Sequence, residues 1–200
     1  MIDSESDLRR LYAAPTERVI RKQLDRLDRH CCRFIELSPF VVIASGGGDE
    51  GLDASPRGGT PGFVAVVDAH TLLIPDAPGN NRLDTLANIT RTGQVGLLFL
   101  VPGLDETLRV NGRARVSDDG SLIARFATER RAPRCVIEVV VTQAYLHCAK
   151  AFMRSKLWSA ECRVDPVSLP TIGQMISEQT GIVSKVETRD EMIARYTPDL

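Results

Sequence analysis

Apolar residues in the middle of the chain occur in short runs, most of them bounded by Gly, Pro, Asp or Asn. These runs are rich in β-branched residues and are too short for buried helices, which favours β-strands. Six strands are predicted, over residues 40–45, 62–67, 71–75, 94–101, 107–117 and 134–148.

The connections between the predicted strands are mostly short. The stretch VDAHT between the second and third strands has hairpin length, and few helices intervene in this part of the chain. The sequence therefore predicts a mainly β fold, in which a six-stranded antiparallel sheet closes into a β-barrel with peripheral helices. This pattern excludes a doubly wound parallel sheet.

Helical spacing is expected on both sides of the strands. Leu24 and Leu27 lie among many charges, and Ile35 and Leu37 follow, which predicts an amphipathic helix over about residues 16–37. We expect further helices over about residues 170–197. A chain of 200 residues, 43% of them hydrophobic, can bury one full core, so we interpret residues 1–200 as a single domain.

Charge and cysteine content limit the classes of partner and compartment. Lys and Arg number 25 against 26 Asp and Glu, so no polyanionic partner such as nucleic acid is favoured, and any anion site must be local. Five cysteines form no paired framework, and the charged N-terminus has no apolar signal region. No apolar run approaches membrane-spanning length. We therefore expect a cytoplasmic protein without a membrane partner.

The stretch GGGDEG, residues 46–51, formally satisfies the dinucleotide-binding pattern G-x-G-x-x-G. That motif requires a helix to begin at its end, so that the pyrophosphate meets the helix N-terminus. The following LDASPRGGTPG contains prolines and glycines that disfavour such a helix. We interpret the motif as the tip of a hairpin.

A second turn carries more hydrogen-bond donors than a helix cap needs. In IPDAPGNNRLDTLANI, residues 74–89, Asn80, Asn81 and Arg82 precede Leu83, Leu86 and Ala87 at helical spacing. Helix N-terminal N–H groups, amides and a guanidinium together suit a phosphate. The alternative from the residues alone is an elaborate capped turn.

Two further segments combine charge with unusual neighbours. ASPRGG places Ser55 and Arg57 on a strand flanked by small residues, which lets a flat ligand approach the backbone. HCAKAFMRSKLWS, residues 147–159, gathers basic side chains around Trp158, the only tryptophan. A basic surface segment anchored by Trp158 is the alternative interpretation of the second segment.

The order of DASPRGGTPGFV, LLIPDAPGNNRLDTLANI, VGLLFL, ETLRVNGRARVS and HCAKAFMRSKLW resembles the pyridoxamine 5'-phosphate oxidase-related split β-barrel proteins, in particular a bacterial subgroup that binds FMN. The resemblance covers about residues 20–198. It implies that Asn80, Asn81 and Arg82 bind the FMN phosphate. It also implies that Ser55, Pro56 and Arg57 line the flavin and its ribityl chain.

The same resemblance implies that Pro75 and Asp76 pass their backbone beside the isoalloxazine ring. Members of the family are homodimers with FMN at the interface, which implies that the second protomer contributes Lys150, Arg154 and Ser155, together with Trp158. Tryptophan and flavin are both flat and polarizable, so their contact is physically reasonable.

Members that oxidise pyridoxamine phosphate have an Arg-x-His pair near the C-terminus, whereas this chain ends in IARYTPDL. That substrate is therefore not expected. The chain contains three histidines, His30, His70 and His147. His70 and His147 have ordinary polar or core roles in our interpretation, with catalysis as the alternative, and the spacing of HCC and HC does not suit a metal.

The resemblance implies an FMN-dependent oxidoreductase that transfers hydride to or from an unidentified small molecule. The open alternatives are a non-catalytic flavin-binding or storage protein, and a split-barrel member that uses haem or a deazaflavin.

Overall fold

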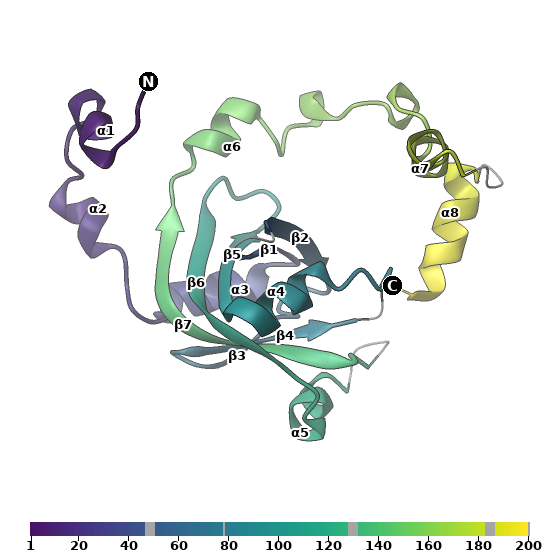
Figure 1. Cartoon of the computed structure of the whole chain (residues 1–200), viewed down its shortest axis with the longest axis horizontal. Coiled ribbons are helices and arrows are strands. Elements are labelled where there is room, and N and C mark those ends of the chain that lie inside the picture. Colours follow the sequence, from purple (N-terminus) through teal and green to yellow (C-terminus); the bar gives the residue numbers. More distant parts are fainter. Residues whose placement is uncertain (47–50, 78, 128–131, 183–186, 200) are drawn as a thin grey trace.

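A single antiparallel sheet forms the centre of the computed structural model, which describes residues 1–46, 51–77, 79–127, 132–182 and 187–199 (Figure 1). Its order is β2-β1-β5-β6-β7-β4-β3. The strands are β1 (Phe40–Gly46), β2 (Leu52–Gly58), β3 (Ala65–Asp68), β4 (Thr71–Asp76), β5 (Gln94–Leu100), β6 (Thr107–Ser117) and β7 (Cys135–His147). The predicted mainly β, antiparallel split-barrel class is confirmed, but the prediction of six strands was wrong, because the described residues contain seven.

The strand missing from the predicted six is β2, which pairs with β1 from Gly46 opposite Leu52 to Phe40 opposite Gly58. It contains Pro56, which has no N–H to donate. The end position of β2 in the sheet order leaves one side of the strand unpaired, where a proline is tolerated. β1 and β2 form a hairpin, whereas residues 47–50 of the GGGDEG motif lie outside the described residues.

The inner face of the curled sheet carries the core. Alternate residues of β1 and β5 are buried, among them Val41, Ile43, Leu97 and Phe99, as expected for strands with one apolar face. The sheet bends where β6 and β7 shift register between Asn111 and Gly112. A side chain at Gly112 would collide with the carbonyl of Val140, so the bulge requires glycine.

Two helices cover this core. α3 (Arg29–Leu37) contributes Cys31, Phe34 and Ile35 to the main apolar cluster, and α4 (Asp84–Thr92) contributes Ile89. α4 packs on β1, β2, β5 and β6. The short α5 (Gly120–Ile123) follows β6 and covers the other side of the sheet near Leu73 and Val136.

The predicted helix over residues 16–37 was wrong, because two helices, α2 (Glu17–Arg21) and α3, occupy this segment. Between them Leu24 pairs with Ala144 of β7 through two backbone hydrogen bonds of 2.9 and 2.8 Å. Asp28 then begins a new helix by accepting from the N–H groups of His30 and Cys31. Strand pairing and this N-cap together interrupt the helical pattern.

The terminal segments extend away from the sheet (Figure 1). They contain α1 (Glu5–Leu11) and α2 at one end, and α6 (Lys150–Ser155), α7 (Ile172–Thr180) and α8 (Arg189–Tyr196) at the other. Helices α7 and α8 fall within the predicted region 170–197. None of these five helices has a buried residue. Apolar side chains therefore remain exposed along both arms, including Leu11, Met153, Leu157 and Ile176.

Candidate functional site

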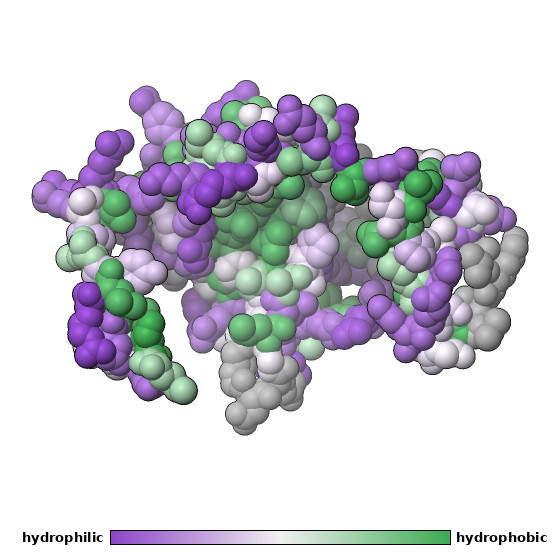
Figure 2. Space-filling model, turned by 90° about the horizontal axis from the view of Figure 1, so that it is seen from above, coloured by the Kyte–Doolittle hydropathy of each residue, from purple (hydrophilic) through white to green (hydrophobic). Residues whose placement is uncertain are grey.

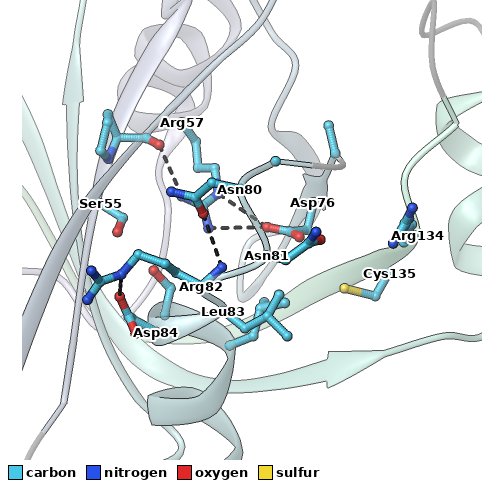
Figure 3. A pocket seen from close by; sticks show the side chains of 15 residues that line it. Ser55, Arg57, Asp76, Asn80, Asn81, Arg82, Leu83, Asp84, Arg134 and Cys135 are labelled. Carbon is cyan, nitrogen blue, oxygen red and sulfur yellow. Dashed lines mark hydrogen bonds and ion pairs between the residues drawn. The ribbon is translucent and has the colours of Figure 1, made fainter. Parts of the chain in front are cut away.

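A cavity of about 640 Å³ opens where β2, the end of β4, the first turn of α4 and the start of β7 meet (Figure 3). Fifteen of the residues that the structure describes line it: Ser55, Pro56, Arg57, Asp76, Ala77, Gly79, Asn80, Asn81, Arg82, Leu83, Asp84, Thr85, Leu86, Arg134 and Cys135. Three segments that are distant in the sequence thus bring polar side chains to one opening.

Seven of the sequence-predicted site residues line this cavity, namely Ser55, Pro56, Arg57, Asp76, Asn80, Asn81 and Arg82. Pro75 lies on β4 opposite Val136 and is not among the lining residues. The structure therefore brings together the two segments that sequence reasoning singled out separately, ASPRGG and the turn before α4.

An ion pair at the cavity wall joins β2 to the end of β4. The Nε and Nη2 atoms of Arg57 donate to Oδ1 of Asp76 at 3.3 and 3.1 Å. The side chains of Arg57 and Asp76 are only 24% and 15% exposed. Arg57 also donates to the carbonyl of Pro56 on its own strand at 3.0 Å. These contacts fix the guanidinium at the cavity wall.

The turn before α4 has an unusual backbone. Asn81 and Leu83 both have positive φ values, of 61° and 62°, although neither is glycine. Asn80 accepts a hydrogen bond from the N–H of Arg82 at 3.1 Å, which closes the turn. The helix begins only at Asp84, and Leu83 provides no side-chain cap. The first-turn backbone of α4 therefore lies at the cavity wall without a side-chain acceptor from its own N-cap.

Arg82 has an acidic neighbour in the same turn. Its Nε donates to Oδ2 of Asp84 at 2.7 Å, and its side chain is 75% exposed. The hydrogen bond and the charge of Asp84 raise the pKa of the Arg82 guanidinium above its ordinary value, and Asp53 adds to this effect. Arg82 therefore stays fully charged at the mouth of the cavity.

A polar cluster next to the cavity was not predicted from the sequence. Ser55 donates to both carboxylate oxygens of Asp53 at 3.0 Å, and Thr85 donates to Oδ2 at 2.5 Å. Thr85 is almost fully buried, at 2% exposed. The alternation of Asp53, Ser55 and Arg57 along β2 was the available signal, since residues two apart share a strand face.

Arg134 and Cys135 at the start of β7 were also missed. Cys135 pairs in register with Asp76, and burial raises the pKa of its thiol, with a further contribution from the negative charge of Asp76. The thiol is therefore protonated at neutral pH and weakly nucleophilic. Figure 3 shows Arg134 and Cys135 on the side of the cavity away from Ser55 and Arg82.

The remaining predicted site residues lie outside this cavity. Lys150, Arg154 and Ser155 belong to α6, and Trp158 follows it. The Trp158 indole stacks on Phe152 at a centroid distance of 5.5 Å, and its Nε1 donates to the carbonyl of Leu104 at 2.8 Å. Trp158 therefore ties the start of the C-terminal arm to the β5–β6 connection of the same chain.

The fold and the cavity define a split β-barrel with a ligand-sized pocket at one end. The chain belongs to the pyridoxamine 5'-phosphate oxidase family, whose model matches residues 27–148. This region contains the sheet and all of the cavity-lining residues that the structure describes, whereas α6, α7 and α8 lie beyond it.

Comparison with solved structures agrees with the fold. HupZ from Group A Streptococcus is 14% identical, has a TM-score of 0.51, and matches over 60% of this chain and 93% of HupZ. A putative pyridoxamine 5'-phosphate oxidase from Lactobacillus delbrueckii is 18% identical, with a TM-score of 0.48 and coverage of 61% of this chain and 95% of that chain. No curated protein matches the sequence significantly.

Within the described residues, no helix combines the length and apolar character that crossing a bilayer requires.

Proposed function

We propose that the chain binds FMN in the cavity between β2, the turn before α4 and α4 itself, as an FMN-dependent oxidoreductase. The observation that carries this proposal is that Ser55, Arg57, Asp76, Asn80, Asn81 and Arg82, drawn from separate segments, line one cavity. Membership of the pyridoxamine 5'-phosphate oxidase family supports it independently.

The residues of the cavity fit such a ligand. Its volume of about 640 Å³ falls within the range of small-molecule and cofactor sites. The described lining residues include three arginines, Arg57, Arg82 and Arg134, and two aspartates, Asp76 and Asp84. The lining therefore carries an excess of positive charge, which suits a ligand with a phosphate group.

The phosphate belongs at the turn before α4 in this proposal. Asn80, Asn81 and Arg82 offer amide and guanidinium donors, and the first turn of α4 adds the positive end of a helix dipole. The left-handed backbone at Asn81 and Leu83 supports this placement, because strained residues concentrate at ligand sites. Ser55, Pro56 and Arg57 line the rest of the flavin and its ribityl chain, with Pro75 and Asp76 beside the ring.

A homodimer completes the proposed site, with Lys150, Arg154, Ser155 and Trp158 supplied by the second copy. Two features support a partner. None of α6, α7 and α8 has a buried residue, although the segment carries many large apolar side chains. Figure 2 also shows apolar residues gathered in a recess at the middle of one face. Exposed apolar surface of this kind is typical of interfaces.

Bound FMN would supply hydride transfer to or from a small molecule, while the chain binds and orients the cofactor. In this assignment Arg82 and the asparagines hold one end of the ligand. The Arg57–Asp76 ion pair keeps a guanidinium at a fixed place on the wall, so that it cannot swing into the ligand space. We expect the protein to act in the cytoplasm.

Flavin titration tests the binding, and reduction kinetics test the chemistry. We expect purified protein to bind FMN more tightly than riboflavin, measured by flavin fluorescence, because only FMN carries the phosphate. Equal affinities would remove the phosphate assignment. Anaerobic stopped-flow mixing of the FMN-loaded protein with NADH or NADPH, followed by oxygen, should show reduction and reoxidation. A bound flavin that neither nucleotide reduces would favour the flavin-binding or storage alternative.

A further inference from the structure

Asp53 accepts hydrogen bonds from two hydroxyl groups that belong to residues lining the cavity. Ser55 donates to both of its carboxylate oxygens at 3.0 Å, and Thr85 donates to Oδ2 at 2.5 Å. Ser55 and Thr85 line the cavity, whereas Asp53 is not among its lining residues and lines a second cavity instead. Asp53 therefore reaches a ligand by hydrogen bonding only through these hydroxyls, while its charge also acts on Arg82.

The direction of these bonds determines what Ser55 offers to a ligand. A carboxylate has no proton to donate, so each hydroxyl must donate its single hydrogen to Asp53. The Ser55 oxygen then presents only lone pairs to the cavity. Donation to a charged acceptor also strengthens the same oxygen as an acceptor. Such an atom suits an O–H donor and does not suit a phosphate.

We propose that Asp53 is a positioning residue that makes Ser55 an acceptor-only contact for hydroxyl groups of the ligand's polyol chain. This inference rests on the proposed FMN site, of which the ribityl chain is the hydroxyl-bearing part. It divides the cavity by chemistry: Arg82 and the asparagines donate to the phosphate, and Ser55 accepts from the ribityl chain.

The surroundings of Asp53 hold it in this arrangement. It pairs with Ser45 of β1, whose hydroxyl accepts from Asn88 of α4 at 3.4 Å. α4 is therefore tied to the sheet at two successive turns, through Thr85 to Asp53 and through Asn88 to Ser45. Since Asn88 does not line the cavity, it provides a control for α4 docking alone.

The test compares three ligands on the full chain after any bound flavin has been removed: FMN, riboflavin and lumiflavin, which lacks the ribityl chain. We expect Asp53→Ala to weaken riboflavin about three- to tenfold, as for one neutral hydrogen bond, and to leave lumiflavin affinity unchanged. The change for FMN also contains the loss of the Asp53 charge near Arg82, so the riboflavin-to-lumiflavin ratio is the decisive measurement. Ser55→Ala should give the same pattern. The double variant should lose no more riboflavin affinity than Ser55→Ala, because Asp53 acts through Ser55.

Asn88→Ala is the matched control. It should lower the unfolding temperature, and any loss of affinity should be equal for all three flavins. Asp53→Ala overturns the inference if it weakens riboflavin and lumiflavin equally, if it weakens neither, or if its effect on riboflavin adds fully to that of Ser55→Ala. A wild-type protein without affinity for any flavin would instead remove the proposed function, and this inference with it.

Discussion

Arg57 and Asp76 form an ion pair between strands that are not neighbours in the sheet. Nη2 of Arg57 lies 3.1 Å from Oδ1 of Asp76, although β1, β5, β6 and β7 stand between β2 and β4 in the sheet order. The contact therefore spans the open side of the curled sheet. It also places a positive group from β2 and a negative group from β4 on the same cavity wall (Figure 3).

Removal of either partner should destabilise the fold. Arg57→Ala and Asp76→Ala leave a partly buried charge without its partner, and we expect each to lower the free energy of unfolding by about 1–3 kcal/mol. The double variant should cost less than the sum of the two, because it leaves no unpaired charge. Urea denaturation of all four proteins gives the coupling energy. A coupling energy near zero would show that the pair does not stabilise the opening.

Most strands could be predicted from the sequence, because alternating apolar and polar residues and a high content of β-branched residues indicate a strand with one buried face. β2 was not counted among the six predicted strands. Its half-buried positions are Asp53, Ser55 and Arg57, and these residues give no apolar alternation. The prediction also merged α2 and α3, since the charged residues of 22–28 fit a helical surface equally well. The pairing of Leu24 with Ala144, 120 residues away, has no local signature.

The candidate site was predicted in part for the same reason. Asn80, Asn81 and Arg82 exceed the needs of a turn, so local chemistry identified them. Thr85 and Cys135 look ordinary in the sequence, and their place at the cavity depends on contacts with distant strands. The acidic partners of Arg57 and Arg82 were likewise not identified, since an arginine gives no indication of which carboxylate it will meet.

We expect the Asp84 carboxylate of the wild-type protein to weaken binding of the FMN phosphate. It accepts a hydrogen bond from Nε of Arg82 and places a negative charge in the first turn of α4. We expect Asp84→Asn to tighten FMN binding several-fold and to leave riboflavin affinity unchanged, because only FMN carries the repelled group. Isothermal titration with both flavins measures the difference. Equal changes for both ligands would place the phosphate elsewhere.

Arg82 itself should contribute to FMN affinity without being indispensable. Arg82→Ala removes a guanidinium while the backbone N–H groups and amides of the turn remain, so binding should weaken but persist. Arg82→Lys should be intermediate, since a point charge remains without the planar fork. Dissociation constants at low and high salt should converge for wild type and Arg82→Ala as screening increases. Unchanged FMN affinity in Arg82→Ala would falsify the assignment and favour Arg57, or Lys150 and Arg154.

The cap of α3 should give stability a pH dependence. Hydrogen bonds from the N–H of Cys31, and then of His30, lower the pKa of Asp28 below its ordinary value of 3.8. A lowered folded-state pKa stabilises the fold above the unfolded-state value, and this stability is lost as pH falls through the folded-state value. Asp28→Ala should therefore cost about 1 kcal/mol at pH 7.

Asp28→Asn is the matched variant, because it keeps a capping oxygen and removes the titration. The stability difference between wild type and Asp28→Asn should shrink between about pH 5 and pH 2, measured by thermal unfolding. A difference that stays constant over this range would mean that Asp28 does not titrate with folding.

The proposed dimer can be tested by complementation between two defective variants. Arg82 lines the cavity, whereas Arg154 lies on α6 outside it. If the two arginines serve one FMN site from different protomers, Arg82→Ala and Arg154→Ala should each weaken FMN binding as homodimers. A mixed dimer then carries one site with both defects and one intact site. Random reassociation of equal amounts should restore wild-type affinity in about a quarter of the sites.

Light scattering should show twice the chain mass. The control is a mixture of Arg82→Ala with Asn80→Ala, which should restore no sites, because both residues would contact the FMN from the same protomer. A monomeric protein with full FMN affinity, or a mixture of Arg82→Ala and Arg154→Ala without recovery, would contradict the shared site.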